Sequence, residues 1–139
     1  MKILIDTNVA LDILLRRQDY ANAALVFSLT QHGIISSYIS ASAITDIFYL
    51  SQKDLGKKAA REHLKSMLRV FKPATVTADH IHQALDFEWD DFEDSVQYVV
   101  GESFSADYIV TGNVMDFTTG EIPAITPERF LKTISVIED

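Results

Sequence analysis

Short apolar runs alternate with longer stretches of helical periodicity along the chain. Runs of apolar and β-branched residues predict buried strands at residues 2–5, 34–39, 71–76, 108–111 and 123–126. Apolar residues spaced three and four apart predict helices at residues 9–17, 20–31, 40–52, 57–70, 77–85, 90–104 and 128–134. The alternation of short strands with helices favours an α/β sandwich around a mainly parallel sheet.

Composition fits an ordinary folded chain without thiol chemistry. The chain has 139 residues, 47% of them hydrophobic and 23% charged, which is compatible with one domain spanning residues 1–139. It contains no cysteine, which excludes disulfides, Cys-ligated metals and a thiol nucleophile, and fits a cytoplasmic location. We expect no signal peptide, because Asp6 follows only three apolar residues, and no apolar run is long enough to span a membrane.

Charge is distributed unevenly. The formal net charge is -8, so passive coating of nucleic acid is not expected. Even so, residues 53–72 hold seven of the 12 basic residues, whereas residues 79–94 hold acids and no Lys or Arg. The basic residues of the helix at 57–70 include Lys57, Lys58, Arg61 and Lys65. This helix either draws a phosphate backbone toward an acidic site, presents a solvated face, or forms a surface for a partner or a second copy.

Four acids stand at or near the expected carboxyl ends of strands, where open parallel sheets bind ligands. Asp6 follows the first strand, Asp46 lies in the helix after the second, Asp94 begins the helix before the fourth, and Asp116 follows the fourth with Asn113. Taken singly, each has a structural reading as a helix cap, surface acid or turn residue. Taken together, four converging carboxylates would repel one another, and divalent ions with a preference for oxygen, Mg²⁺ or Mn²⁺, would relieve that repulsion.

The same segments carry a resemblance to a known family. They are Ile-Asp6-Thr7-Asn8, Ser42 to Leu50 around Asp46, Asp91-Phe92-Glu93-Asp94, and Thr111-Gly112-Asn113-Val-Met-Asp116-Phe117. In this order and spacing, and with the closing segment 122–131, they resemble the PIN-domain family over essentially the whole chain. The resemblance implies a three-layer α/β/α sandwich with a central, mainly parallel five-stranded sheet.

The resemblance also implies an activity. PIN domains usually cleave single-stranded RNA with metal ions, and many small bacterial members are VapC-type toxins, commonly dimeric and held inactive by an antitoxin. It makes Asp6, Asp94 and Asp116 metal ligands and Asp46 the remaining acid of the catalytic set. Thr7, Asn8, Thr111 and Asn113 become supporting residues.

Two positions depart from the family pattern and support an alternative to the nuclease function. Asp46 stands where the family usually has glutamate, which is one methylene longer, and Gly112 stands where many members have Arg or Asn. These departures favour a PIN-fold module that binds nucleic acid or protein with weak or no catalysis. A phosphatase of the haloacid dehalogenase type is disfavoured, because Asn8 stands where that chemistry requires a second aspartate.

Overall fold

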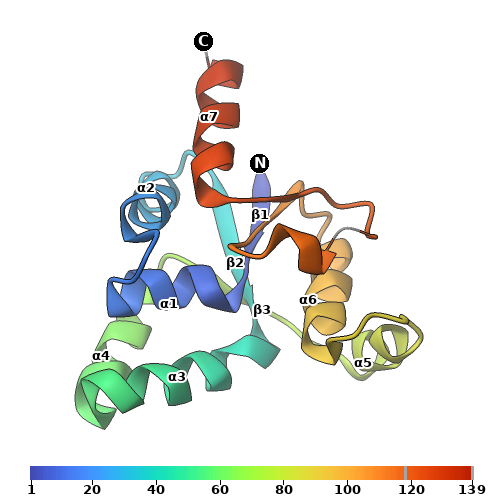
Figure 1. Cartoon of the computed structure of the whole chain (residues 1–139), viewed down its shortest axis with the longest axis horizontal. Coiled ribbons are helices and arrows are strands. Elements are labelled where there is room, and N and C mark those ends of the chain that lie inside the picture. The colour runs from blue at the N-terminus through green and yellow to red at the C-terminus, as the bar shows by residue number, and fades with distance from the viewer. Residues whose placement is uncertain (118, 139) are drawn as a thin grey trace.

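A five-stranded sheet forms the centre of the structure, a computed structural model that describes residues 1–117 and 119–138 (Figure 1). The strand order is β3-β2-β1-β4-β5, and all neighbouring strands are parallel. The strands are β1 (Lys2–Ile5), β2 (Ser36–Ser40), β3 (Lys72–Ala74), β4 (Tyr108–Val110) and β5 (Ala124–Ile125). The chain moves outward from β1 in both directions, so the carboxyl ends of β1 and β4 flank the point at which such sheets bind ligands.

Strand β1 is buried on both faces at the middle of the sheet. Ile3 and Ile5 point into one apolar cluster and Leu4 points into another, and all three are 0% exposed. This alternation follows from the two-residue period of a strand. A continuous apolar run is what a central parallel strand requires, because helices cover both of its faces.

Helices cover both faces of the sheet (Figure 1). On the face of Ile3 and Ile5 lie α1 (Thr7–Leu15), α2 (Tyr20–Gln31), α3 (Ala41–Leu55), α4 (Lys57–Met67) and α7 (Pro127–Glu138). On the opposite face lie α5 (Ala78–Leu85) and α6 (Phe92–Ser103), and a short 3-10 helix, η1 (Val114–Phe117), follows β4. The predicted three-layer α/β/α sandwich with a five-stranded sheet is confirmed, and its sheet is parallel throughout.

Local sequence explains where several elements begin and end. Asp6 caps α1, because its side chain accepts a hydrogen bond from the Thr7 N–H. Thr77 caps α5 in a capping box with His80. Gly56, at a φ of 81°, separates α3 from α4. Pro73 is tolerated in β3 because this strand lies at the edge of the sheet.

Membrane-spanning helices are absent from the part of the chain that the structure describes. The longest helix, α3, has 15 residues, whereas a span needs about 20 mostly apolar residues.

Candidate functional site

Asp6 is the most enclosed carboxylate at the carboxyl edge of the sheet. It follows β1 directly and is 5% exposed. Its Oδ1 accepts from the Thr7 backbone N–H at 2.7 Å, and its Oδ2 accepts from the Thr111 hydroxyl at 2.8 Å and the Asn8 amide at 3.1 Å. The Gln97 side chain also hydrogen-bonds to Asp6. Four donors from β1–α1, β4 and α6 therefore hold one carboxylate in place.

Asn8 and Thr111 join the loop after β4 to the start of α1. Asn8 Oδ1 accepts from the Gly112 N–H at 3.0 Å, and Thr111 Oγ1 accepts from the Asn113 N–H at 2.9 Å. A Cβ on Gly112 would lie 3.4 Å from Asn8 Oδ1. The loop thus passes close to Asn8, and glycine leaves that amide room to reach both Gly112 and Asp6.

Burial and hydrogen bonding act on Asp6 in opposite directions. Burial raises the pKa of Asp6, the hydrogen bonds from Thr111, Gln97 and Thr7 oppose that rise, and repulsion from Asp116 adds to it. Among the described residues, the recorded ion pairs are Arg17–Asp12 and Lys132–Glu128, so none neutralises Asp6. Within the described residues, hydrogen-bond donors rather than a Lys or Arg side chain stabilise this carboxylate.

Asp94 and Asp116 line the same cavity, and both interact electrostatically with Asp6. The cavity has a volume of about 260 Å³. It is lined by Glu88, Trp89, Asp90, Asp91, Asp94, Met115, Asp116 and Thr119. Burial, followed by repulsion from Asp91, Asp6, Asp116 and Glu93, raises the pKa of Asp94 to about 7. The charges of Asp6, Asp94 and Asp116 are therefore close enough to influence one another.

Asp46 lies on α3 and is paired with Glu93 of α6. Glu93 accepts a hydrogen bond from the Thr7 hydroxyl at 3.3 Å and shares another with Asp46. Burial, and then the hydrogen bond and repulsion from Asp46, raise the pKa of Glu93 to about 7. Thr7 links this pair to Asp6, since it donates to Asp6 through its backbone and to Glu93 through its side chain. We call Asp6, Asp46, Glu93, Asp94 and Asp116 the candidate site.

The donors of the candidate site suit a hard divalent cation. All are carboxylate oxygens, and burial together with mutual repulsion raises the pKa values of Glu93 and Asp94, a rise that a bound cation would oppose. As the side chains stand, no group of three acid or histidine residues within the described part of the chain converges on one ion position. Mg²⁺ commonly uses one or two carboxylates together with several waters, so the residues fit such an ion with water completing the ligands.

Glu93 and Gln97 belong to this site, although neither was among the predicted site residues. Glu93 lies inside the segment that carries the family resemblance, but within that segment the resemblance predicts the adjacent Asp94 as the metal ligand. Gln97 is 1% exposed between apolar neighbours Val96 and Tyr98. A lone polar residue in an apolar helical stretch, four residues after Glu93 and three after Asp94, was the available signal.

The predicted nucleic-acid-binding residues, Lys57, Lys58, Arg61 and Lys65, are exposed on α4. Arg61 and Lys65 line a groove of about 500 Å³ between α3 and α4, and the Arg61 guanidinium lies 5.3 Å from the Phe48 ring centroid. The rest of the groove is formed by Ile44, Thr45, Phe48, Tyr49, Leu64 and Leu68. Because α3 also carries Asp46, the basic residues lie on the helix adjoining one that contributes to the candidate site.

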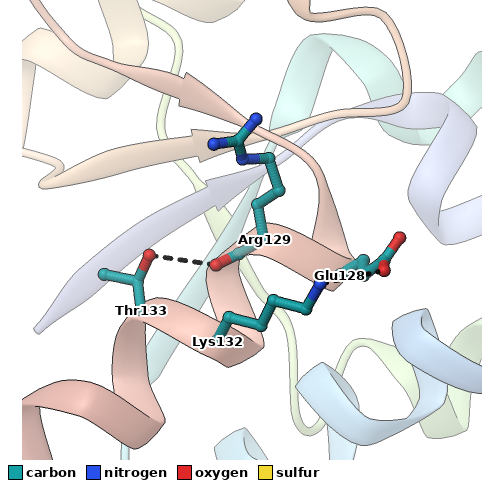
Figure 2. A pocket seen from close by; sticks show the side chains of 4 residues that line it. All are labelled: Glu128, Arg129, Lys132 and Thr133. Carbon is teal, nitrogen blue, oxygen red and sulfur yellow. Dashed lines mark hydrogen bonds and ion pairs between the residues drawn. The ribbon is translucent and has the colours of Figure 1, made fainter.

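A hollow of about 480 Å³ lies on α7. Figure 2 shows its lining residues, Glu128, Arg129, Lys132 and Thr133, all on one helix. Lys132 pairs with Glu128 at 3.3 Å, and the Thr133 hydroxyl donates to the Arg129 carbonyl at 2.9 Å. The hollow brings together no acids from separate elements, so the candidate site remains the one at the carboxyl edge.

Comparison with known proteins identifies the family. The chain belongs to the PIN domain family, whose model matches residues 2–115. That match includes Asp6, Asp46, Glu93 and Asp94, and it ends one residue before Asp116. A comparison with curated proteins gave no match.

Solved structures show the same fold at low sequence identity. VapBC2 from Rickettsia felis, bound to a DNA fragment from their promoter, superposes with a TM-score of 0.68 at 16% identity over 90% of this chain and 97% of that chain. VapC20 of Mycobacterium tuberculosis, described as a Sarcin-Ricin loop cleaving toxin, superposes with a TM-score of 0.67 at 17% identity, over 85% of this chain and 95% of that chain. FitAB bound to an IR36 DNA fragment superposes with a TM-score of 0.61 at 18% identity, over 90% of this chain and 94% of that chain. At this level of identity the likeness concerns the fold.

Proposed function

We propose that the protein is a metal-dependent endoribonuclease that cleaves single-stranded RNA at the candidate site, within a single PIN domain. The observation that carries the proposal is that Asp6 after β1, Asp116 after β4 and Asp94 at the start of α6 lie close enough for their charges to repel one another. A site with this arrangement gains most from a divalent cation.

Each residue has a definable part in this chemistry. Asp6 is kept in one orientation by its donors, so it can present an oxygen to the ion without reorganising. Asp94 and Asp116 would supply further ligands across the cavity. A bound Mg²⁺ or Mn²⁺ would lower the pKa of a water for attack on phosphorus and neutralise charge on the phosphate. Asp46 would act through Glu93, its partner on α6.

The basic residues of α4 provide an attraction for phosphate that the acids of the candidate site cannot provide. With a net charge of -8, the chain as a whole repels RNA. Lys57, Lys58, Arg61 and Lys65 on α4 would hold the phosphate backbone locally, next to the helix that carries Asp46. The proposed substrate is single-stranded RNA, as the resemblance to PIN domains implies.

We also propose that the protein acts in the cytoplasm as the toxin of a toxin–antitoxin pair, binds an antitoxin protein and forms a homodimer. The family membership and the fold shared with VapC20 and VapBC2 support this role. Gel filtration of the protein alone and with the product of an adjacent gene would test both associations.

The direct test combines metal binding with cleavage. Mn²⁺ is titrated into the wild type, Asp6→Asn, Asp94→Asn and the exposed control Asp86→Asn by calorimetry. The same samples are incubated with single-stranded RNA and with a sarcin–ricin-type stem-loop. Binding and cleavage by the wild type and Asp86→Asn, with both lost in the other variants, is the expected result. A wild type that binds no Mn²⁺ at millimolar concentration makes the proposal wrong.

A second candidate function is a PIN-fold binding module with little or no catalysis. The observation that favours it is the distance that still separates the carboxylates in the described residues, together with the Asp46–Glu93 pairing, which occupies one acid with another. Tight RNA binding with neither metal uptake nor cleavage in the same experiment would establish this module instead.

A further inference from the structure

Gln97 is a buried amide on α6 that faces the candidate site. Its side chain hydrogen-bonds to Asp6 and is 1% exposed. Its Oε1 has no hydrogen-bond partner in the described part of the chain. A buried acceptor without a donor costs free energy, so packing alone does not account for glutamine at this position.

The helix places this amide on the same side as the carboxyl groups of the candidate site. Gln97 follows Asp94 by three residues and Glu93 by four, and these spacings put side chains on one face of a helix. That face lies against the end of β1, where Asp6 holds the amide by a hydrogen bond. Its Oε1 is therefore a buried acceptor without a donor on a residue that contacts Asp6.

We propose that Gln97 is a positioning residue: its amide N–H holds the Asp6 carboxylate toward the site, and its free Oε1 accepts a hydrogen bond from a water of the site when a divalent ion is bound. The inference rests on the proposed function, because it needs an ion near Asp6 and Asp94. Residues that orient ligands in this way typically change metal affinity by about 10–100-fold.

A merely structural glutamine would behave differently. Methionine has similar length and no polar atom to leave unsatisfied. If Gln97 only filled space, Gln97→Met would leave metal affinity unchanged and make the metal-free protein as stable or more stable. If Gln97 positions Asp6, the same change weakens metal binding while the fold persists.

The test measures Mn²⁺ affinity by calorimetry and the unfolding midpoint without metal for the wild type, Gln97→Met and Gln97→Leu. Gln52→Met is the matched control, because Gln52 Oε1 is also buried and unpartnered. Gln52 lies six residues beyond Asp46, about 9 Å further along α3. We expect the Gln97 variants to remain folded and to bind Mn²⁺ about tenfold or more weakly, and Gln52→Met to bind as the wild type does.

Equal affinity of the wild type and Gln97→Met overturns the inference and leaves the proposed function standing. An equal loss of Mn²⁺ affinity in Gln52→Met also overturns the inference, because replacing any buried, unpartnered glutamine would then weaken metal binding. If neither Gln97 variant folds, Gln97 is a structural residue and the inference is wrong. If the wild type itself binds no Mn²⁺, the proposed function is wrong, and the inference that rests on it is wrong as well.

Discussion

The hydroxyl of Thr111 donates a hydrogen bond of 2.8 Å to Asp6 Oδ2, although 105 residues separate the two along the chain. Thr111 is 0% exposed and directly follows β4, while Asp6 directly follows β1. The same hydroxyl oxygen accepts from the Asn113 N–H. One threonine therefore orients the most buried acid and directs the loop that leads to Asp116.

Replacing Thr111 by valine removes both hydrogen bonds at nearly constant volume. We expect Thr111→Val to lower the free energy of unfolding by about 1–3 kcal/mol, because Asp6 loses a buried donor and the Asn113 N–H loses its acceptor. Thr111→Ser should restore most of it. Urea denaturation measures the change, with Thr133→Val on α7 as the control. Equal stability of Thr111→Val and the wild type would contradict the role given to this hydroxyl.

Stability of the metal-free protein should fall as pH rises through the neutral range. The pKa of Glu93 is raised from 4.5 to about 7 and that of Asp94 from 3.8 to about 7. Between these limits the folded state binds more protons than the unfolded state, so folding is favoured at the acidic end and loses that advantage toward pH 7.

Thermal unfolding from about pH 5 to about pH 8 measures this trend. The double variant Glu93→Gln, Asp94→Asn should flatten the curve, because its amides do not titrate. Added Mn²⁺ should stabilise the wild type more at the alkaline end, where the ligands are ionised. A wild-type curve with the same slope as the double variant would show that these groups titrate normally.

The Asp46–Glu93 pair gives a prediction about a single carboxyl group. Asp46→Asn removes the like charge and leaves an amide that can donate to Glu93, so the pKa of Glu93 should fall and the metal-free protein should gain stability at about pH 8. Carbon-13 NMR of the Glu93 carboxyl group follows its titration. Asp54→Asn, near the exposed end of α3, should leave that titration unchanged. Unaltered titration in Asp46→Asn would mean that the pair does not govern Glu93.

The basic residues of α4 predict how RNA binding depends on salt. Each phosphate contact to a single strand contributes about 0.7 to the slope of log affinity against log salt. Lys58→Gln with Lys65→Gln should therefore reduce the slope by about 1.4 if both residues contact phosphates. Fluorescence anisotropy without divalent ions measures it, and Arg129→Gln on α7 is the control. An unchanged slope would mean that Lys58 and Lys65 face solvent and do not contact the phosphates of the RNA.

Tyr98 connects α6 to the segment after η1 through its hydroxyl oxygen. That oxygen accepts from the Glu121 N–H at 2.6 Å and from the Ile122 N–H at 3.2 Å. Tyr98→Phe leaves both donors without this acceptor and should cost about 1–3 kcal/mol of unfolding free energy. Tyr49→Phe, at a tyrosine that is 58% exposed, should change stability little. Chemical denaturation measures the free energy of unfolding of both variants. An equal change in the two would contradict the role given to the Tyr98 hydroxyl.

Local chemistry made much of the fold predictable from sequence. The apolar run at residues 2–5 predicted a buried strand, and Asp6 and Thr77 are cap residues whose effect is confined to one helical turn. The short η1 helix was not predicted, because Asn113 and Asp116 equally suit an irregular turn. Strand β3 ends at Ala74, two residues before the predicted end.

The candidate site was predictable only in part. The placement of Asp6, Asp94 and Asp116 follows from strand order, which an alternating α/β pattern largely determines. The pairing of Asp46 with Glu93 depends on how α3 packs against α6, and these helices are not neighbours in sequence. The contact between Gln97 and Asp6 depends on how α6 packs against the end of β1. The assignment of the predicted residues to catalysis and metal binding stays a prediction.

The sheet order has a consequence for the chain while a ribosome is still making it. β1 is the first strand to emerge, yet one of its two neighbours is β4, and Thr111 and Asp116 follow β4. Until that late segment has emerged, Asp6 lacks the Thr111 hydroxyl and the site lacks Asp116. A chain that stops short of residues 111–116 therefore has an incomplete candidate site, and the proposed activity at that site has to wait until this segment has been made and has packed against β1.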